Sequence, residues 1–251
     1  MPYLSAMTIQ RLLQANAPLR KEPSHRAEMT SQLLFGERFD IKETAGDWVY
    51  VQCVHDGYEG WLEYKVVCER SDEAQSSGII TRDFAHVVYR DETLVLPFGS
   101  LCPMPMLKHN ANKNDFIRES VSIDHAIELI ESVFHLAPYL WGGRTAMGVD
   151  CSGLTQLYGR LIGINLPRDA WQQESAVEPL NAEATCERGD LLFFAEPEGK
   201  ISHVGIYIGE DKILHASGRV RIDLLTKEGI IHGQTGKLTH HFHSAGKISK
   251  Y

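Results

Sequence analysis

The run from Tyr139 to Leu161 constrains this 251-residue chain most, because it joins structure-breaking glycines to a cysteine at the start of a helical pattern. Gly142, Gly143 and the loop after them interrupt regular structure. Apolar residues then recur at helical spacing, which predicts that Cys151 opens a helix. A helix N-terminus carries partial positive charge and unpaired N–H groups. We therefore expect Cys151 to have a lowered pKa and an oxyanion site beside it, which is half of a cysteine hydrolase.

The base that such a nucleophile needs is predicted on two later strands, Ser202–Gly209 and Lys212–Ser217. Alternation in the first strand puts the branched apolar residues on one face and His203 with Gly205 on the other. A hairpin loop with an odd number of residues would bring His203 and His215 to one face, whereas an even loop would separate them. In the favourable register His203 is the general base and His215 orients its imidazole.

Each of these residues also has an ordinary structural interpretation. A lone cysteine is most often a small buried apolar side chain, and lone histidines on strands are more often structural than catalytic. The combination of a glycine-bounded cysteine, a helix start and two histidines on successive strands favours a catalytic site.

Five motifs, in this order, resemble those of bacterial NlpC-type papain-like cysteine peptidases. They are Tyr139-Leu140-Trp141-Gly142-Gly143, Asp150-Cys151-Ser152-Gly153, Leu166-Pro167-Arg168-Asp169-Ala170 with Gln173, Arg188–Phe194 and His203–Gly209. The resemblance covers about the last half of the chain. It implies an α+β fold with a papain-like catalytic domain, in which a helix carrying the cysteine packs on an antiparallel sheet. It also implies cleavage of cell-wall stem peptides between γ-D-glutamate and the diamino acid.

The same resemblance implies a role for individual residues. Cys151 is the expected nucleophile, His203 the base and His215 the third, polar member of the triad. The motif positions expected to line the substrate groove are Tyr139, Trp141, Asp150, Ser152, Arg168 and Asp169. Asp169 can hold a peptide ammonium group, and Arg168 either binds a carboxylate or only packs locally. The two aromatic residues form either a wall of the groove or part of the core.

The first hundred residues are organised differently. Short alternating segments cut by turn residues, from Ala17 to about Cys68, predict a small β-barrel. They resemble a bacterial SH3-like domain, most specifically at Gly57-Tyr58-Glu59-Gly60-Trp61. A weaker repetition from Ile79 to Leu107 indicates a second, reduced barrel.

These patterns divide the chain into three parts. We expect an SH3-like barrel in residues 1–70, a linker with a second, reduced barrel in 71–110, and the catalytic domain in 111–251. The polar stretch Glu69–Gly78 is interpreted as the linker. Asp124 is the expected cap of an amphipathic helix that starts the catalytic domain.

A barrel in a cell-wall enzyme either anchors the protein to the wall or closes one end of the catalytic groove. Some peptidases that this chain resembles act on free peptides that begin with L-Ala-γ-D-Glu, and we expect the same substrate here. Glu28 and Tyr58, with Tyr64 behind them, are candidates for completing the pocket for the free amine. The alternatives are a hydrolase of intact peptidoglycan, a cysteine amidase or acyltransferase, and a wall-binding module without catalysis.

Composition narrows the class of partner. The net charge of −8 argues against nucleic acid and anionic membranes. Neither a long apolar stretch nor a signal peptide is visible, which predicts no membrane insertion and favours a cytoplasmic location, with export after signal removal as the alternative. The five cysteines lack paired spacing, so no disulfide framework is expected. We expect neither a cofactor nor a metal, and His240, His241 and His243 are interpreted as a polar segment. Oligomeric state is left open.

Overall fold

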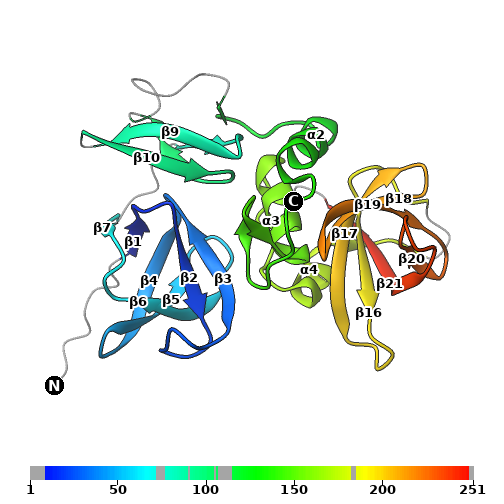
Figure 1. Cartoon of the computed structure of the whole chain (residues 1–251), viewed down its shortest axis with the longest axis horizontal. Coiled ribbons are helices and arrows are strands. Elements are labelled where there is room, and N and C mark those ends of the chain that lie inside the picture. The colour runs from blue at the N-terminus through cyan, green and yellow to red at the C-terminus, as the bar shows by residue number, and fades with distance from the viewer. Residues whose placement is uncertain are drawn as a thin grey trace. The chain divides into compact units, whose positions relative to one another are not determined.

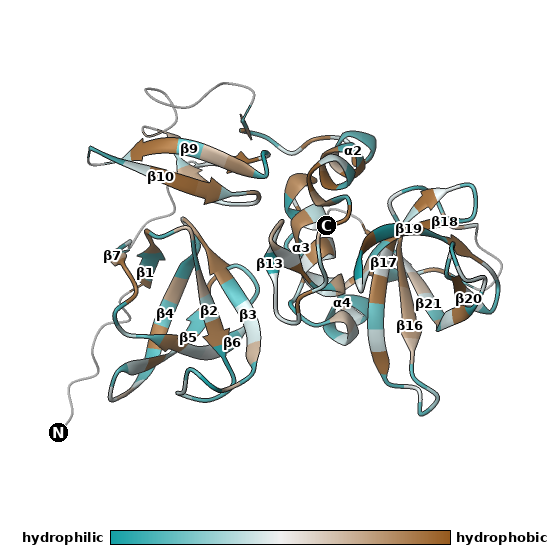
Figure 2. Cartoon of the chain, viewed as in Figure 1, coloured by the Kyte–Doolittle hydropathy of each residue, from teal (hydrophilic) through white to brown (hydrophobic). Residues whose placement is uncertain are grey.

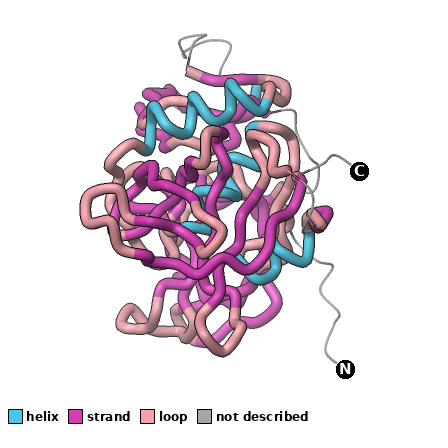
Figure 3. Tube along the Cα trace, turned by 90° about the vertical axis from the view of Figure 1, so that its right-hand side faces the viewer, coloured by secondary structure: helices cyan, strands magenta, loops and turns pink. Residues whose placement is uncertain are grey.

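The chain divides into two compact units, Met1–Glu119 and Ser120–Tyr251. The computed structural model describes residues 9–71, 77–89, 91–104, 106, 115–181 and 185–248. Its elements are labelled in Figure 1, and strands supply most of the regular structure (Figure 3). The second unit therefore begins at Ser120 rather than at the predicted residue 111.

The first part of unit 1 is an antiparallel sheet wrapped around one apolar core. Its strands are β1 (Ile9–Leu12), β2 (Asn16–Arg20), β3 (Met29–Leu34), β4 (Arg38–Ala45), β5 (Trp48–Cys53), β6 (Glu59–Glu63) and β7 (Cys68–Arg70), in the order β3-β2-β6-β5-β4-β1-β7. Burial alternates along β5, where Val49, Val51 and Cys53 face the core. This period of two is what the sequence predicted for a small barrel.

The second part of unit 1 consists of two small sheets where a second, reduced barrel was predicted. Its strands are β8 (Ser77–Ile80), β9 (Phe84–Tyr89), β10 (Glu92–Pro97), β11 (Leu101–Pro103) and β12 (Phe116–Ile117), in a β11-β8-β12 sheet and a β9-β10 hairpin. Their shared core includes Leu13 and Phe35 of the first part. Gly36 makes this contact possible, because a Cβ there would lie 1.8 Å from the Leu101 carbonyl oxygen.

The predicted linker Glu69–Gly78 is too long at both ends. Glu69 and Arg70 belong to β7, which pairs with β1, and Ser77 begins β8. The middle of the linker, 72–76, lies outside the described residues. Strand pairing with β1 overrides the polar composition of Glu69 and Arg70, because pairing needs only backbone groups.

In unit 2, the described residues form three helices packed against a sheet. The sheet has the order β15 (Glu178–Pro179), β21 (Leu238–Lys247), β16 (Leu191–Ala195), β17 (Ile201–Gly209), β18 (Lys212–Ser217), β19 (Arg219–Leu225) and β20 (Gly229–Ile231), and β20 also pairs with β21. This last pairing closes the strands from β21 to β20 into a barrel. The helices are α2 (Ile123–Phe134), α3 (Cys151–Leu161) and α4 (Ala170–Ala176), and a short hairpin, β13 (Arg144–Thr145) with β14 (Gly148–Val149), precedes α3.

Helix α3 lies at the centre of unit 2. All of its residues are buried, and it contacts β17 and β18 of the sheet and both other helices. Hydrophobic and hydrophilic residues alternate along β17 (Figure 2), so one face of the strand packs into the core while the other can present polar groups. The predicted arrangement, a helix carrying the cysteine packed on an antiparallel sheet, is the one observed.

The N-cap of helix α2 lies two residues earlier in the chain than predicted. Ser122, not Asp124, is the N-cap, and its Oγ accepts a hydrogen bond from the His125 N–H at 3.3 Å. Asp124 lies in the first turn, where its carboxylate pairs with Arg188 (Nε–Oδ1 2.7 Å). Serine is as good an N-cap as aspartate, so the sequence alone did not separate them. No helix among the described residues is long and apolar enough to span a bilayer.

Candidate active site

Cys151 is the first residue of α3, as predicted, and only 5% of it is exposed. Asp150 caps the helix, and its Oδ1 accepts a hydrogen bond from the Gly153 N–H at 2.7 Å. Glycine is required at 153, because a Cβ there would lie 2.4 Å from the Gly143 carbonyl oxygen. The glycine-rich loop therefore closes tightly on the turn that presents the sulfur.

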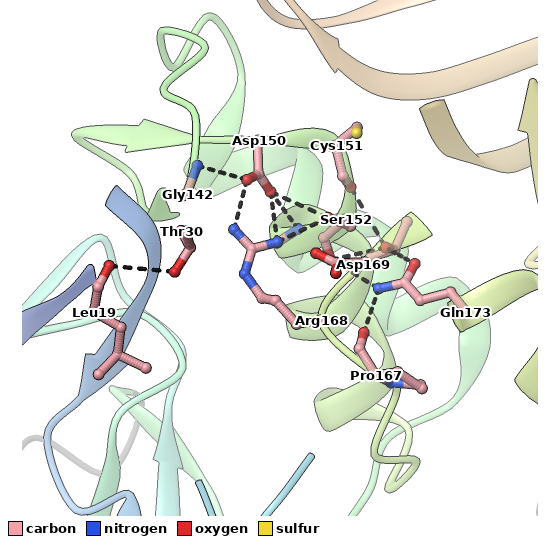
Figure 4. A network of polar contacts seen from close by, with 12 residues as sticks. Leu19, Thr30, Gly142, Asp150, Cys151, Ser152, Pro167, Arg168, Asp169 and Gln173 are labelled. Carbon is pink, nitrogen blue, oxygen red and sulfur yellow. Dashed lines mark hydrogen bonds and ion pairs between the residues drawn. The ribbon is translucent and has the colours of Figure 1, made fainter. Parts of the chain in front are cut away.

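The Asp150 carboxylate also joins this turn to two other segments (Figure 4). Its Oδ2 accepts a hydrogen bond from the Gly142 N–H at 2.8 Å. Arg168 holds both carboxylate oxygens, with Nη1–Oδ1 at 3.0 Å and Nη2–Oδ2 at 2.5 Å, and its Nη1 donates to the Ser152 Oγ at 2.8 Å. Arg168 is 1% exposed. Of its two predicted roles, this geometry favours local packing, because a bidentate pair directs the guanidinium at Asp150.

Gln173, which the sequence marked only as part of a motif, fixes the same turn from α4. It is completely buried. Its Nε2 donates to the carbonyl oxygens of Ser152 at 3.0 Å and Pro167 at 2.9 Å, and its Oε1 accepts from the Thr155 hydroxyl at 2.6 Å. Each polar atom of this buried amide is satisfied, so it ties the first turn of α3 to the segment before α4.

The two predicted histidines lie on one face of the sheet, and a bulge rather than the loop length puts them there. The loop between β17 and β18 has two residues, Glu210 and Asp211, both with positive φ. An even loop would separate His203 from His215. A β-bulge between Tyr207 and Gly209 shifts the register by one residue and restores the shared face. The sequence left the parity of this loop open; the loop is even, and the bulge produces the shared face expected for the favourable register.

A chain of hydrogen bonds leads away from His203. His203 Nε2 lies 2.8 Å from His215 Nδ1, and His215 Nε2 lies 3.2 Å from Asp223 Oδ2. Asp223 is buried and is held by the Arg221 guanidinium (2.7 Å) and the Gly233 N–H (2.9 Å). Gly205 leaves room for these rings, because a Cβ there would lie 2.9 Å from the Cβ of His215.

Sequence reasoning missed Asp223. The available signal was an acidic residue between the apolar residues Ile222 and Leu224 of β19. His215 pairs with Arg221 in the β18–β19 register, so Asp223, two residues on, shares the face of His215.

His240 is the second residue that sequence reasoning missed. Its ring stacks on His203, with centroids 4.1 Å apart and planes at 26°, and meets His215 edge-on at 5.8 Å. Its Nδ1 lies 2.9 Å from the Thr239 hydroxyl. Interpreting His240, His241 and His243 as one polar segment was wrong for His240, because alternation along β21 turns it inward and leaves the other two exposed.

The sulfur of Cys151 lies against the strand that carries His203. It accepts hydrogen bonds from the backbone N–H groups of Val204, the residue after His203, and of Ser152. Burial nevertheless raises the pKa of the Cys151 thiol to about 12, with a further increase from the charge of Asp150. The predicted lowering of this pKa is therefore wrong for the resting site, because loss of solvent outweighs the helix N-terminus.

The histidines are neutral in the same site. Burial lowers the pKa of His203 well below 6.5, and His215 and His240 add to the effect. Burial also lowers the pKa of His215, against the opposing effect of Asp223. Although burial acts the other way, hydrogen bonds from His215, Gly233 and Arg221 hold the pKa of Asp223 far below its ordinary value. The resting site thus holds a thiol against the backbone of β17, and neutral imidazoles backed by a carboxylate.

The remaining groove candidates of unit 2 surround the start of α3 and α4. Tyr139 is half-buried, and burial together with the charges of Cys151 and Asp150 raises the pKa of its phenol. Trp141 is 58% exposed. Asp169 is the half-buried N-cap residue of α4, and its N–H donates to the Gln172 side chain at 3.2 Å. The structure therefore brings Tyr139 close to the nucleophile and leaves the indole of Trp141 accessible.

The three candidates of unit 1 lie just outside the strands of its first sheet, Glu28 before β3, Tyr58 before β6 and Tyr64 after β6. Glu28 is exposed and pairs with Lys21 at 3.4 Å. Tyr58 is half-buried against the core of the sheet, and Tyr64 is 64% exposed. Their part in a substrate groove stays a prediction.

Comparison with known proteins identifies the family of this chain. Residues 136–238 match the NlpC/P60 family, and residues 19–65 match the bacterial dipeptidyl-peptidase SH3 domain. The chain is 32% identical over 213 residues to the γ-D-glutamyl-L-lysine dipeptidyl-peptidase of Bacillus subtilis strain 168, which covers 74% of this chain and 71% of that protein. The chain belongs to the NlpC/P60 family. It is a cysteine peptidase of that family with an N-terminal SH3 domain.

Two further matches agree with the assignment of this NlpC/P60 peptidase. It is 28% identical over 249 residues to the γ-D-glutamyl-L-lysine dipeptidyl-peptidase of Bacillus cereus, with 83% of this chain and 74% of that protein covered. The crystal structure of an NlpC/P60 family protein from Bacillus cereus superposes with a TM-score of 0.80 and 21% identity, covering 96% of this chain and 99% of that one. The predicted resemblance is confirmed for the family and for the fold.

Proposed function

We propose that this NlpC/P60 peptidase hydrolyses the bond between γ-D-glutamate and the diamino acid of cell-wall stem peptides, with Cys151 as nucleophile. The observation that carries the proposal is the sulfur of Cys151 at the start of α3, bonded to the N–H of the residue that follows His203. Two relatives that share most of the chain's length are named γ-D-glutamyl-L-lysine dipeptidyl-peptidases, which supports the choice of bond.

The hydrogen-bond chain assigns the protons. Asp223 accepts from His215 Nε2–H, so His215 Nδ1 is an acceptor and takes the hydrogen bond of His203 Nε2–H. His203 Nδ1 is then the unprotonated nitrogen, and it takes the proton of the Cys151 thiol as the sulfur attacks the γ-D-glutamyl carbonyl. The imidazolium that forms is stabilised through His215 by the Asp223 carboxylate.

The second half of the reaction returns the proton. His203 Nδ1–H protonates the amine of the diamino acid as it leaves, and a γ-D-glutamyl thioester remains on Cys151. Water that gives its proton to the same nitrogen hydrolyses the thioester and restores the thiol. Backbone N–H groups at the start of α3 stabilise the oxyanion in both steps. No cofactor takes part in this scheme.

The substrate is a free peptide that begins with L-Ala-γ-D-Glu. A dipeptidyl-peptidase releases a dipeptide from a free amino end, so its groove needs a group for the ammonium. In this proposal Asp169 is that group, Tyr139 and Trp141 form the wall, and Asp150, Ser152 and Arg168 position the nucleophile rather than touch substrate.

The test uses four substrates: free L-Ala-γ-D-Glu-L-Lys, its diaminopimelate counterpart, the N-acetylmuramyl-capped peptide and intact sacculi. Products are identified by mass, with the Cys151→Ala protein as control. We expect release of L-Ala-D-Glu from the free peptides alone. Cleavage of the capped peptide or of sacculi would overturn the free-peptide preference, and cleavage at another bond would overturn the assigned bond.

A further inference from the structure

Three imidazoles from three different strands converge in the barrel of unit 2. His203 on β17, His215 on β18 and His240 on β21 each offer a ring nitrogen, and these three nitrogens lie within 4.8 Å of one another. The rings of His203 and His215 are buried and that of His240 is half-buried. The scheme proposed for peptide hydrolysis uses the first two and gives His240 no proton to carry.

The outer nitrogens of two of these rings are already held by oxygen. His215 Nε2 lies 3.2 Å from Asp223 Oδ2, and His240 Nδ1 lies 2.9 Å from the Thr239 hydroxyl. Histidines that ligate a metal almost always have the second nitrogen hydrogen-bonded to a carboxylate, a carbonyl or water, which orients the ring. The Asp223–His215 pair has this arrangement. With these outer nitrogens bonded, Nδ1 of His215 and Nε2 of His240 are the ring nitrogens left to ligate a metal.

The separations require only a modest rearrangement. Zn²⁺ binds imidazole nitrogen at about 2.0–2.1 Å, so ligand nitrogens in a tetrahedral site lie about 3.3 Å apart. His203 Nε2 and His215 Nδ1 are 2.8 Å apart and must separate slightly, which breaks their hydrogen bond. The His240 ring must move toward the other two rings. It can turn, because it is held against His203 only by stacking.

We propose that His203, His215 and His240 form a binding site for Zn²⁺ that inhibits the enzyme. Three neutral imidazoles suit zinc, whereas Mg²⁺ and Ca²⁺ prefer oxygen ligands. Bound zinc replaces the proton shared by His203 and His215 and withdraws electron density from the ring that must accept the thiol proton. The inhibitory effect rests on the function proposed above, but the binding does not.

The binding test uses the full-length Cys151→Ala protein, which removes the nucleophilic thiol as a ligand. Equilibrium dialysis against ZnCl₂, with MgCl₂ as the metal control, measures stoichiometry and Kd. We expect the Cys151→Ala protein to bind one more zinc ion per chain than the Cys151→Ala protein that also carries His240→Gln. That substitution should weaken binding at this site by at least about tenfold, and Thr239→Val, which removes the outer hydrogen bond, should weaken it by about tenfold.

His241→Gln is the matched control, because His241 is the exposed neighbour on the same strand. Equal zinc binding by the His240→Gln and His241→Gln proteins would overturn the proposal, as would the absence of stoichiometric binding. Circular dichroism of both proteins checks that they fold alike.

Activity gives the second readout. Zinc should inhibit hydrolysis of L-Ala-γ-D-Glu-L-Lys by the wild-type and His241→Gln proteins, and EDTA should restore the activity. A higher zinc concentration should be needed to inhibit the His240→Gln protein. Stoichiometric zinc binding by a protein that cleaves none of the peptides would sustain the metal site and overturn the proposed function. Peptide cleavage by a protein that binds no zinc would do the reverse.

Discussion

The two halves of the active site are built in different ways. The cysteine half comes from one stretch of chain, residues 139–173, in which close backbone contacts at Gly143 and Gly153 and the buried Asp150–Arg168 pair fix one helical turn. The histidine half takes one residue from each of several strands, and its geometry depends on the register between them. The first is held by local packing and the second by sheet topology. Rigidity is therefore concentrated beside the nucleophile, whereas proton transfer depends on alignment across the sheet.

The largest loss of activity is expected when the general base is removed. His203→Ala should lower kcat/KM for the free tripeptide by about 10³-fold or more, because no other group described here can take the thiol proton. The measurement is the rate of diamino acid release. His241→Ala, an exposed histidine on the same sheet, serves as control and should retain activity. Comparable activity of the two proteins would remove His203 from the mechanism.

The next effect tests whether the cysteine half is held by its buried ion pair. Arg168→Met leaves the Asp150 carboxylate buried without its partner, which should lower the free energy of unfolding by about 3–5 kcal/mol. Urea unfolding measures the change. Lys247→Met removes the exposed pair with Glu187 and should have little effect. Similar stabilities for both variants would mean that the network around Asp150 does not rigidify the turn.

A smaller effect tests the hydrogen-bond chain of the histidine half. Asp223→Asn keeps the size of the side chain but removes the charge behind His215, so kcat should fall by about 10²-fold while KM changes little. Steady-state kinetics on the free tripeptide separate the two constants. A change in KM alone would show that Asp223 affects substrate binding rather than proton transfer.

The smallest expected effect is a dependence of stability on pH that belongs to the histidine half. Burial lowers the pKa of His203 and His215 below 6.5 and that of His240 to about 4. Below pH 6.5 the unfolded chain therefore binds more protons than the folded one, and the free energy of unfolding falls as the pH drops toward 4.

Urea unfolding over this range measures the slope. The slope should decrease in a His240→Gln protein and remain in a His241→Gln protein. Stability that is constant from neutral pH down to the titration of the carboxylates would contradict the buried, neutral state of these rings.

The same contrast explains what the sequence predicted. The helix start at Cys151 and the motif glycines follow from local patterns, so the cysteine half was predicted with its neighbours. The role of Gln173 was not, because its three partners are known only after α4 packs on α3. In the histidine half, the shared face of His203 and His215 depends on a bulge that no residue type in the sequence indicates. His240 joins the site through strand pairings that are distant in sequence, and Asp223 joins it through the β18–β19 register. Burial, not the helix N-terminus, decides the pKa of Cys151.

The role of Cys151 as nucleophile is tested most directly by the rate at which the wild-type and Cys151→Ala proteins cleave free L-Ala-γ-D-Glu-L-Lys, measured as lysine released. We expect rapid release of lysine by the wild-type protein, with L-Ala-D-Glu as the other product, and no release above the uncatalysed rate by the variant. Release of lysine by the Cys151→Ala protein would contradict the assignment of Cys151 as the nucleophile.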